Sequence, residues 1–139
     1  NIASTTIVAG RSLTLSGDSV EVDSEIYSGS FTFAFTDATT TKNGQLQHAR
    51  PSAYTITQIA CYTSTSTVTV QLDERASTTP LTAGTDTMSA SLVCDTDQQA
   101  TSTFSNAGIA AYAKLNLDFD ATAITGIGGG VTVFYTTDD

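Results

Sequence analysis

The stretch that decides the fold class is residues 54–74, YTITQIACYTSTSTVTVQLDE. In its second half Val68, Val70 and Leu72 alternate with polar residues, which is the two-residue period of a strand with one face on a core and one in water. The preceding run, residues 56–62, is also strand-like but apolar on both faces. Residues 63–66 (TSTS) are a polar turn between the two runs, so we expect the runs to pair as a β-hairpin.

The same alternation predicts strands elsewhere in the chain. They are expected as two short runs within residues 11–26 and at residues 30–36, 87–94, 100–104, 112–119 and 131–135. Phe31, Phe33 and Phe35 share one face of the strand at 30–36 and are expected in the core, with an exposed strip for a partner subunit or a sugar ring as the alternative. In the strand at 112–119, Asn116 and Asp118 are expected on the solvent side. Residues 37–52 show no strand pattern and predict a long loop.

Composition favours an all-β domain. The chain has 27 Thr and 15 Ser among 139 residues, and Thr suits strands and turns while forming helices poorly. A chain of this length can bury the core of one ordinary domain. Polar turns between strands every 8–12 residues or so are typical of an antiparallel two-sheet sandwich, so we predict a jelly-roll-like sandwich of about eight to ten strands.

The first ten residues, NIASTTIVAG, carry no charge and allow two interpretations. They are either the first strand of the domain or an arm that adds a strand to the sheet of a neighbouring copy. In the second case Ile2, Thr6, Ile7 and Val8 would make the assembly contacts. Residues 11–139 are predicted to form a single β-sandwich domain.

The two cysteines, Cys61 and Cys94, are expected to form a disulfide, with a pair of free buried thiols as the alternative. A disulfide fits the Ser/Thr-rich, Lys-poor composition, which resembles that of extracellular proteins. The chain starts at Asn1 rather than Met, which would fit the removal of a leader. These features predict an extracellular, secreted protein.

Charge makes several classes of partner improbable. Five Lys and Arg stand against fourteen Asp and Glu, for a net charge of −9. Such a chain repels phosphate backbones and anionic lipid surfaces, so we expect no nucleic-acid partner. No apolar run reaches 18 residues, so we expect no membrane span in this chain.

The sequence contains no catalytic motif. Nucleophilic catalysis needs a nucleophile beside a base, and His48, the only histidine, has no such companion nearby and is expected in an exposed loop. Asp95 and Asp97 are interpreted as an ordinary turn, with a weak cation site as the alternative. We therefore expect no enzyme activity, no cofactor and no metal.

A resemblance covers residues 51–135. It rests on an apolar strand after Pro51, a Thr/Ser turn, VTVQLDE, a loop with LTAGTD, a strand ending near Cys94, NAGIAAYAKLNLDFD and a terminal GGGVTVFY strand. This order resembles a jelly-roll module found in virion proteins of tailed phages and in uncharacterised secreted bacterial structural proteins. The usual module has Ala-Ala-Gly-Asp before the penultimate strand, where this chain has AGIAA at residues 107–111. The resemblance implies a structural or adhesive role in a repeating assembly and no catalytic residues.

These observations predict a structural protein, the repeating subunit of a pilus-like extracellular filament whose partners are copies of itself. A phage virion protein, in capsid decoration or a tail, is the first alternative, with the virion as its location. A carbohydrate-binding sandwich is the second, although the chain has no Trp and its five Tyr are scattered.

Overall fold

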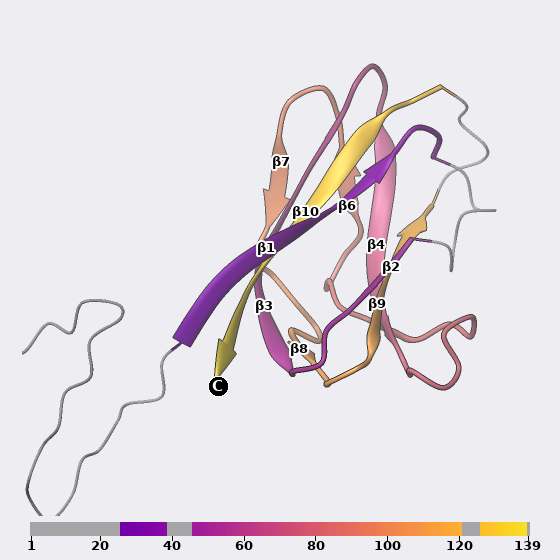
Figure 1. Ribbon diagram of the computed structural model, residues 1–139. Helices are drawn as coiled ribbons and strands as arrows, with labels where there is room; N and C mark the ends of the chain where they lie inside the picture. The colour runs from indigo at the N-terminus through magenta and orange to yellow at the C-terminus, as the bar shows by residue number, and fades with distance from the viewer. Residues whose placement is uncertain (1–25, 39–45, 121–125, 139) are drawn as a thin grey trace, which may run out of the picture.

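The computed structural model describes residues 26–38, 46–120 and 126–138. These residues form ten β-strands joined by turns and loops, and they contain no helix. The strands form two layers that face each other (Figure 1). In chain order they are β1 (Ile26–Phe35), β2 (Gln47–Ala49), β3 (Tyr54–Thr63), β4 (Val68–Arg75), β5 (Thr85–Asp86), β6 (Leu92–Cys94), β7 (Gln99–Thr101), β8 (Gly108–Ile109), β9 (Lys114–Phe119) and β10 (Gly129–Asp138).

Each layer is an antiparallel sheet of five strands. The first sheet has the order β1-β10-β3, and β7 and β8 pair with opposite ends of β3. The second sheet has the order β2-β9-β4, and β5 and β6 pair with opposite ends of β4. When β5 with β6, and β7 with β8, are each counted as one interrupted strand, the eight positions run 1-8-3-6 and 2-7-4-5. This is a jelly-roll order, so the predicted sandwich is confirmed.

The core lies between the sheets and is built from alternate residues of each strand. The side chains that are almost completely buried there include Val68, Val70, Leu72, Leu115, Leu117 and Phe119 from the second sheet and Ile56, Ile59, Val131 and Val133 from the first. Phe33 and Phe35 are buried as well, and the Phe35 ring meets the Phe119 ring edge-on with centroids 5.0 Å apart. The aromatic face of β1 is therefore core and not an exposed strip.

The predicted hairpin in residues 54–74 is wrong. Its two strands exist as β3 and β4, but they lie in opposite sheets and do not pair with each other. The turn carries the chain across the sandwich, with the Thr63 N–H donating to the Asp95 carbonyl and the Ser64 N–H donating to the Gly128 carbonyl, each at 2.7 Å. A four-residue polar turn can connect the strands of a hairpin or carry the chain from one sheet to the other. Here β10 occupies one edge of β3 and β7 and β8 occupy the other, so β4 has no edge of β3 to pair with.

Two other predictions need correction. Residues 37–52 are not a continuous loop, because β2 pairs with β9 there, and a strand of three residues is too short to show alternation. The strand expected at 87–94 is shorter, since only Leu92–Cys94 forms β6, while Met88 makes an isolated bridge to Phe104. The paired runs expected within residues 11–26 precede Ile26 and lie outside the described residues.

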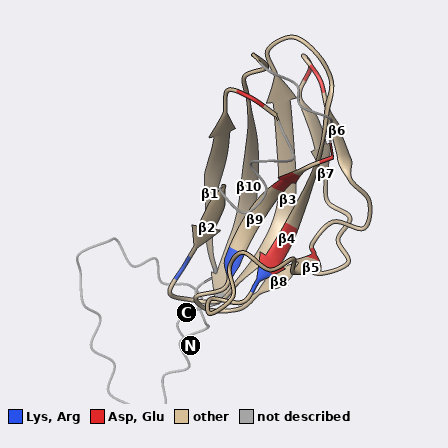
Figure 2. Ribbon diagram, turned by 90° about the vertical axis from the view of Figure 1, so that its right-hand side faces the viewer, with Lys and Arg blue, Asp and Glu red and all other residues tan. Residues whose placement is uncertain are grey.

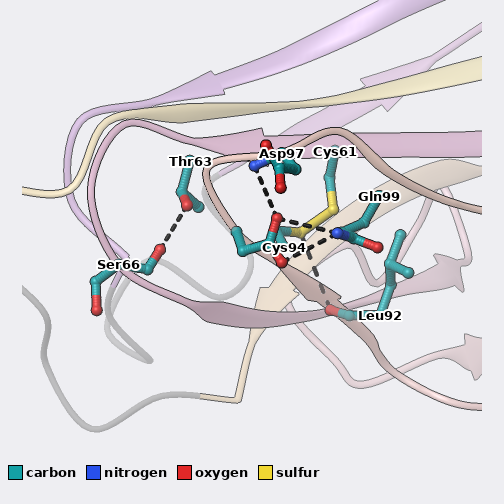
Figure 3. Close-up of a disulfide and its surroundings, with 8 residues drawn as sticks. Cys61, Thr63, Ser66, Leu92, Cys94, Asp97 and Gln99 are labelled. Carbon is teal, nitrogen blue, oxygen red and sulfur yellow. Dashed lines mark hydrogen bonds between the residues drawn. A yellow bond between two sulfur atoms is a disulfide. The ribbon is translucent and has the colours of Figure 1, made fainter.

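The disulfide between Cys61 and Cys94 is present, as predicted (Figure 3). It joins β3 of the first sheet to the end of β6 in the second, and both sulfurs are buried. The neighbouring turn is fixed by Asp95, whose carboxylate accepts hydrogen bonds from the Asp97 N–H at 2.9 Å and from Gln99 Nε2 at 3.0 Å. The bond therefore fastens the two sheets at the end where β3 turns into β4.

Removing the disulfide should cost much of the domain's stability. Cys61 and Cys94 are 33 residues apart, and closing a loop of that length restricts the unfolded chain by about 3–4 kcal/mol. We predict that the double variant Cys61→Ala, Cys94→Ala loses about that amount in urea unfolding, and that reduced wild-type protein loses a similar amount. An unchanged unfolding midpoint in both would contradict the clamping role.

Candidate functional site

The residues predicted as sites fall into three groups. Cys61 and Cys94 form the structural bond described above. The four candidate assembly residues, Ile2, Thr6, Ile7 and Val8, lie outside the described residues. The expectation of an exposed loop histidine is wrong, because His48 lies in β2 and is partly buried with its ring stacked on Phe31, centroids 3.7 Å apart.

The outer face of the second sheet carries a polar cluster of the buried residues Asp73, Arg75 and Asn116 and the partly exposed Asp118. Arg75 Nε donates to Asp73 Oδ2 at 2.7 Å, and Arg75 Nη2 donates to Asp118 Oδ2 at 3.1 Å. Asn116 Nδ2 donates to Asp73 Oδ1 at 2.8 Å and also to Asp118 Oδ1. Asn116 has no exposed surface, so its predicted solvent position is wrong, whereas Asp118 keeps partial exposure.

Residues 76–84, the loop between β4 and β5, are fastened to this cluster. The Gly84 N–H donates to Asp73 Oδ2 at 2.8 Å, and the Pro80 carbonyl accepts hydrogen bonds from Arg75 Nη1 and Gln47 Nε2. A Cβ atom on Gly84 would lie 1.8 Å from the Glu74 carbonyl oxygen, so only glycine fits there. The alternation of apolar and polar residues in the strands gives no sign of this close approach between Gly84 and Glu74. The glycine in LTAGTD is the one sequence feature that indicates it.

The hydrogen bonds of the cluster hold residues 76–84 against the second sheet. Burial raises the pKa of Asp118 above its usual range, and the nearby carboxylate of Asp73 adds to the effect. Arg75 supplies one positive charge and forms an ion pair with each of the two carboxylates. Buried polar groups are costly unless paired, and here the pairing is internal to the cluster and its loop. The carboxylates of Asp73 and Asp118 therefore contribute to holding residues 76–84 in place, Asp73 by its bond to Gly84 and both by positioning Arg75.

A second cluster lies at the end of the core where β2 meets β3, and it contains Phe31, His48, Arg50, Tyr54 and Tyr135. The Arg50 guanidinium lies over the Tyr135 ring, 4.4 Å from its centroid, and Nη1 donates to the Tyr135 hydroxyl. Burial lowers the pKa of His48, and the Arg50 charge lowers it further. Burial raises the pKa of Tyr54. His48 Nε2, Arg50 Nε and the Tyr54 hydroxyl are buried and have no hydrogen-bond partner within the described part of the chain.

An open cleft of about 440 Å³ lies near the start of β3 and the end of β10. Its lining residues are Ala53, Tyr54, Thr55, Glu74, Gly108, Ile109, Ala110 and Thr136, with no His, Cys or Lys among them. The carboxylate of Glu74 already accepts hydrogen bonds from Asn106 Nδ2 at 2.9 Å and from the Ala110 N–H at 2.8 Å. The acid in the cleft therefore fixes the loop around β8.

Strand β1 lies at the margin of the first sheet. It pairs with β10 along all ten of its residues and with no other described strand. The other edge positions belong to β2, β5, β6, β7 and β8, each two or three residues long. Proteins usually protect a long edge with charges, proline or a bulge, but β1 (IYSGSFTFAF) has none of these and its register is unbroken. The backbone groups of residues 28–35 on this edge can therefore accept another strand.

We infer function from this geometry, because the comparisons with protein families and with curated proteins gave no match. No protein-family model matches the chain, and no curated protein is a significant match. Within residues 26–38, 46–120 and 126–138 there is no helix long and apolar enough to cross a membrane. In the same ranges no three His, Cys, Asp or Glu side chains are grouped so that they could hold a metal ion.

The tight approach at Gly84 can be tested with a matched pair of variants. We predict that Gly84→Ala destabilises the protein by about 2 kcal/mol or more, because the new methyl group collides with backbone that cannot yield cheaply. Gly108→Ala is the control, since nothing lies within 4 Å of its added Cβ, and should change stability by less than about 0.5 kcal/mol. Equal unfolding midpoints for the two variants would contradict the fastening role of residues 76–84.

His48 provides a pH test, because it is the only histidine and its NMR signals are unambiguous. We predict that it titrates below 6.5 in the folded protein. Since the folded-state pKa is below the unfolded one, its contribution to stability is complete above pH 6.5 and is lost as the pH falls through the folded pKa. His48→Phe should keep the stacking on Phe31 and remove this part of the acid sensitivity. A measured pKa at or above 6.5 would contradict the burial.

Proposed function

We propose that this protein is a non-enzymatic building block, the repeating subunit of an extracellular filament whose copies join by β-strand addition along β1. The observation that carries the proposal is the uncharged and unbroken edge of β1, which over residues 28–35 pairs with no other described strand. Strand addition at such an edge supplies backbone hydrogen bonds along its whole length, and alternate side chains provide specificity. A sandwich clamped by Cys61–Cys94 is a rigid body on which such an edge can be displayed.

The strand that fills the edge is proposed to be residues 1–10 of a neighbouring copy. This segment has no charge, so it can approach a subunit of net charge −9 without repulsion. Ten extended residues span about 33 Å, which matches the ten residues of β1. Ile2, Thr6, Ile7 and Val8 are the residues whose side chains would determine the fit.

A phage virion protein is the second candidate. The specific observation in its favour is the jelly-roll strand order, which agrees with the fold expected from the resemblance over residues 51–135. The disulfide favours the extracellular filament, because structural disulfides persist in oxidising compartments and are rare in the cytosol where virions assemble. Both candidates are assemblies of many copies, and they differ in the compartment in which the copies meet.

Deleting residues 1–9 tests the proposed function. Negative-stain microscopy and sedimentation should show filaments for the full chain and single subunits for the deleted chain, because the donated strand is gone. A synthetic peptide of residues 1–10, added in excess to the deleted chain, should bind it, while a peptide of the same composition in scrambled order should not. Filaments that persist after the deletion, or a full chain that remains monomeric at all concentrations, would contradict the proposal.

A further inference from the structure

Charge is divided unequally between the two sheets. The strands of the first sheet, β1, β3, β7, β8 and β10, contain no Lys, Arg or Glu and a single Asp, the residue that ends β10. The strands of the second sheet contain six charged residues, namely Asp73, Glu74, Arg75, Asp86, Lys114 and Asp118. Figure 2 shows this contrast, with coloured segments on β4 and β9 and an entirely tan β1.

The outward side of the first sheet is therefore a neutral face, which we define by the outward side chains of β1, β10, β3 and β7. Val131 and Val133 point into the core, so Thr132 and Phe134 point outward. Across the middle of the face the register aligns a row of four small residues, Thr32, Thr132, Ala60 and Ala100. The hydroxyls of Thr32 and Thr132 are hydrogen-bonded to each other at 2.8 Å, so each has a hydrogen-bond partner within the protein and depends less on water.

Two aromatic side chains lie beside this row, Tyr62 and the partly buried Phe134, and Tyr62 is the more exposed of the two. The Tyr62 ring lies against Gly130, where an added Cβ would come within 3.2 Å of it and within 3.3 Å of Thr32 Cγ2. Tyr62 nevertheless remains 54% exposed, although it belongs to the strand that carries Cys61. The neutral face thus has one strongly exposed aromatic side chain, Tyr62, next to a row of small residues, and these two features can fit together across a contact between two copies.

We propose that the neutral face packs on the neutral face of a second copy in a two-fold arrangement, with each Tyr62 against the Thr132 row of its partner. This inference rests on the proposed function only in taking copies of the chain as partners, and it uses a different surface from the β1 edge. With a net charge of −9 per copy, close approach requires a contact area free of charge, and this face is one.

The size of the face is adequate for such a contact. Strands β1, β10 and β3 have ten residues each and are about 33 Å long, β7 has three residues and is about 10 Å long, and at a spacing of about 4.8 Å the four cover about 500 Å². Two such faces together give about 1,000 Å², the lower bound for a specific interface between proteins. The face is continuous with the open edge of β1, so stacked sheets about 10 Å apart would join two filaments side by side. Strand addition lengthens a filament, and face packing pairs filaments laterally.

One substitution separates the two contacts. Thr132→Glu places like charges opposite each other across the two-fold contact without touching residues 1–10. Thr69→Glu is the matched control, because Thr69 lies between the inward residues Val68 and Val70 on the opposite side of the molecule and receives the same change in charge. In negative-stain images we expect paired filaments for the wild type and for Thr69→Glu, and single filaments for Thr132→Glu.

Disulfide cross-linking tests the contact between two neutral faces directly. Both native cysteines are bonded to each other, so a cysteine introduced at Thr132 is the one free thiol of the full-length chain. Under mild oxidation Thr132→Cys should give a covalent dimer, whereas Thr69→Cys should remain monomeric on a non-reducing gel. The dimer yield should fall at least tenfold when Tyr62→Ala is added.

Four results would overturn the inference, and each is distinct from failure of the proposed function. They are wild-type filaments that are always single, pairing that survives Thr132→Glu, no preferential cross-linking at Thr132, or wild-type binding to an insoluble polysaccharide that depends on Tyr62 while copies do not pair. The last result would make the neutral face a carbohydrate platform. Absence of filaments combined with Thr132 cross-linking would instead contradict strand addition and support the face contact.

Discussion

Strand β10 is the element on which the rest of the structure depends. It lies between β1 and β3 and is hydrogen-bonded to both, with a continuous register along β1 and one shift along β3. Its inward residues Val131 and Val133 are fully buried. Because the last described strand, β10, lies between β1 and β3, β1 is left at the margin of the first sheet, and its outer edge over residues 28–35 pairs with no other described strand. The proposed assembly edge is thus a direct consequence of the strand order.

The two sheets of the sandwich serve different purposes in this account. The second sheet contains nearly all the charged residues of the strands. In it the buried carboxylate of Asp73 accepts hydrogen bonds from Arg75, from Asn116 and from Gly84 at the end of the loop 76–84. The first sheet is nearly free of charge and offers both a backbone edge and a broad face. The disulfide connects the sheets, so the two surfaces move as one body. For a chain of net charge −9, concentrating the ionic groups on one side leaves the other side able to meet another copy.

How much could be predicted from the sequence depended on how local each constraint is. Burial of one strand face imposes a period of two, so the strands around Val68, Leu117 and Val133 were predictable. The placement of β3 and β4 in opposite sheets was not predictable, because a short polar turn fits a hairpin and a crossing between sheets equally well. Asn116 was expected in water because nothing in the period of β9 reveals that residues 76–84 are fastened across it. The open edge of β1 depends on partners distant in sequence and could be found only from the sheet order.

The central claim is that copies join at the open edge of β1, and backbone hydrogen exchange measures this most directly. Amide exchange should be compared between assembled protein and dissociated subunits, residue by residue along β1 and along the short edge strands of the second sheet. The account predicts that alternate amides of β1, those that point away from β10, become strongly protected only on assembly, while β2 and β5 change little. Unchanged exchange along β1, with new protection at β2 or β5 in the assembled material, would contradict it.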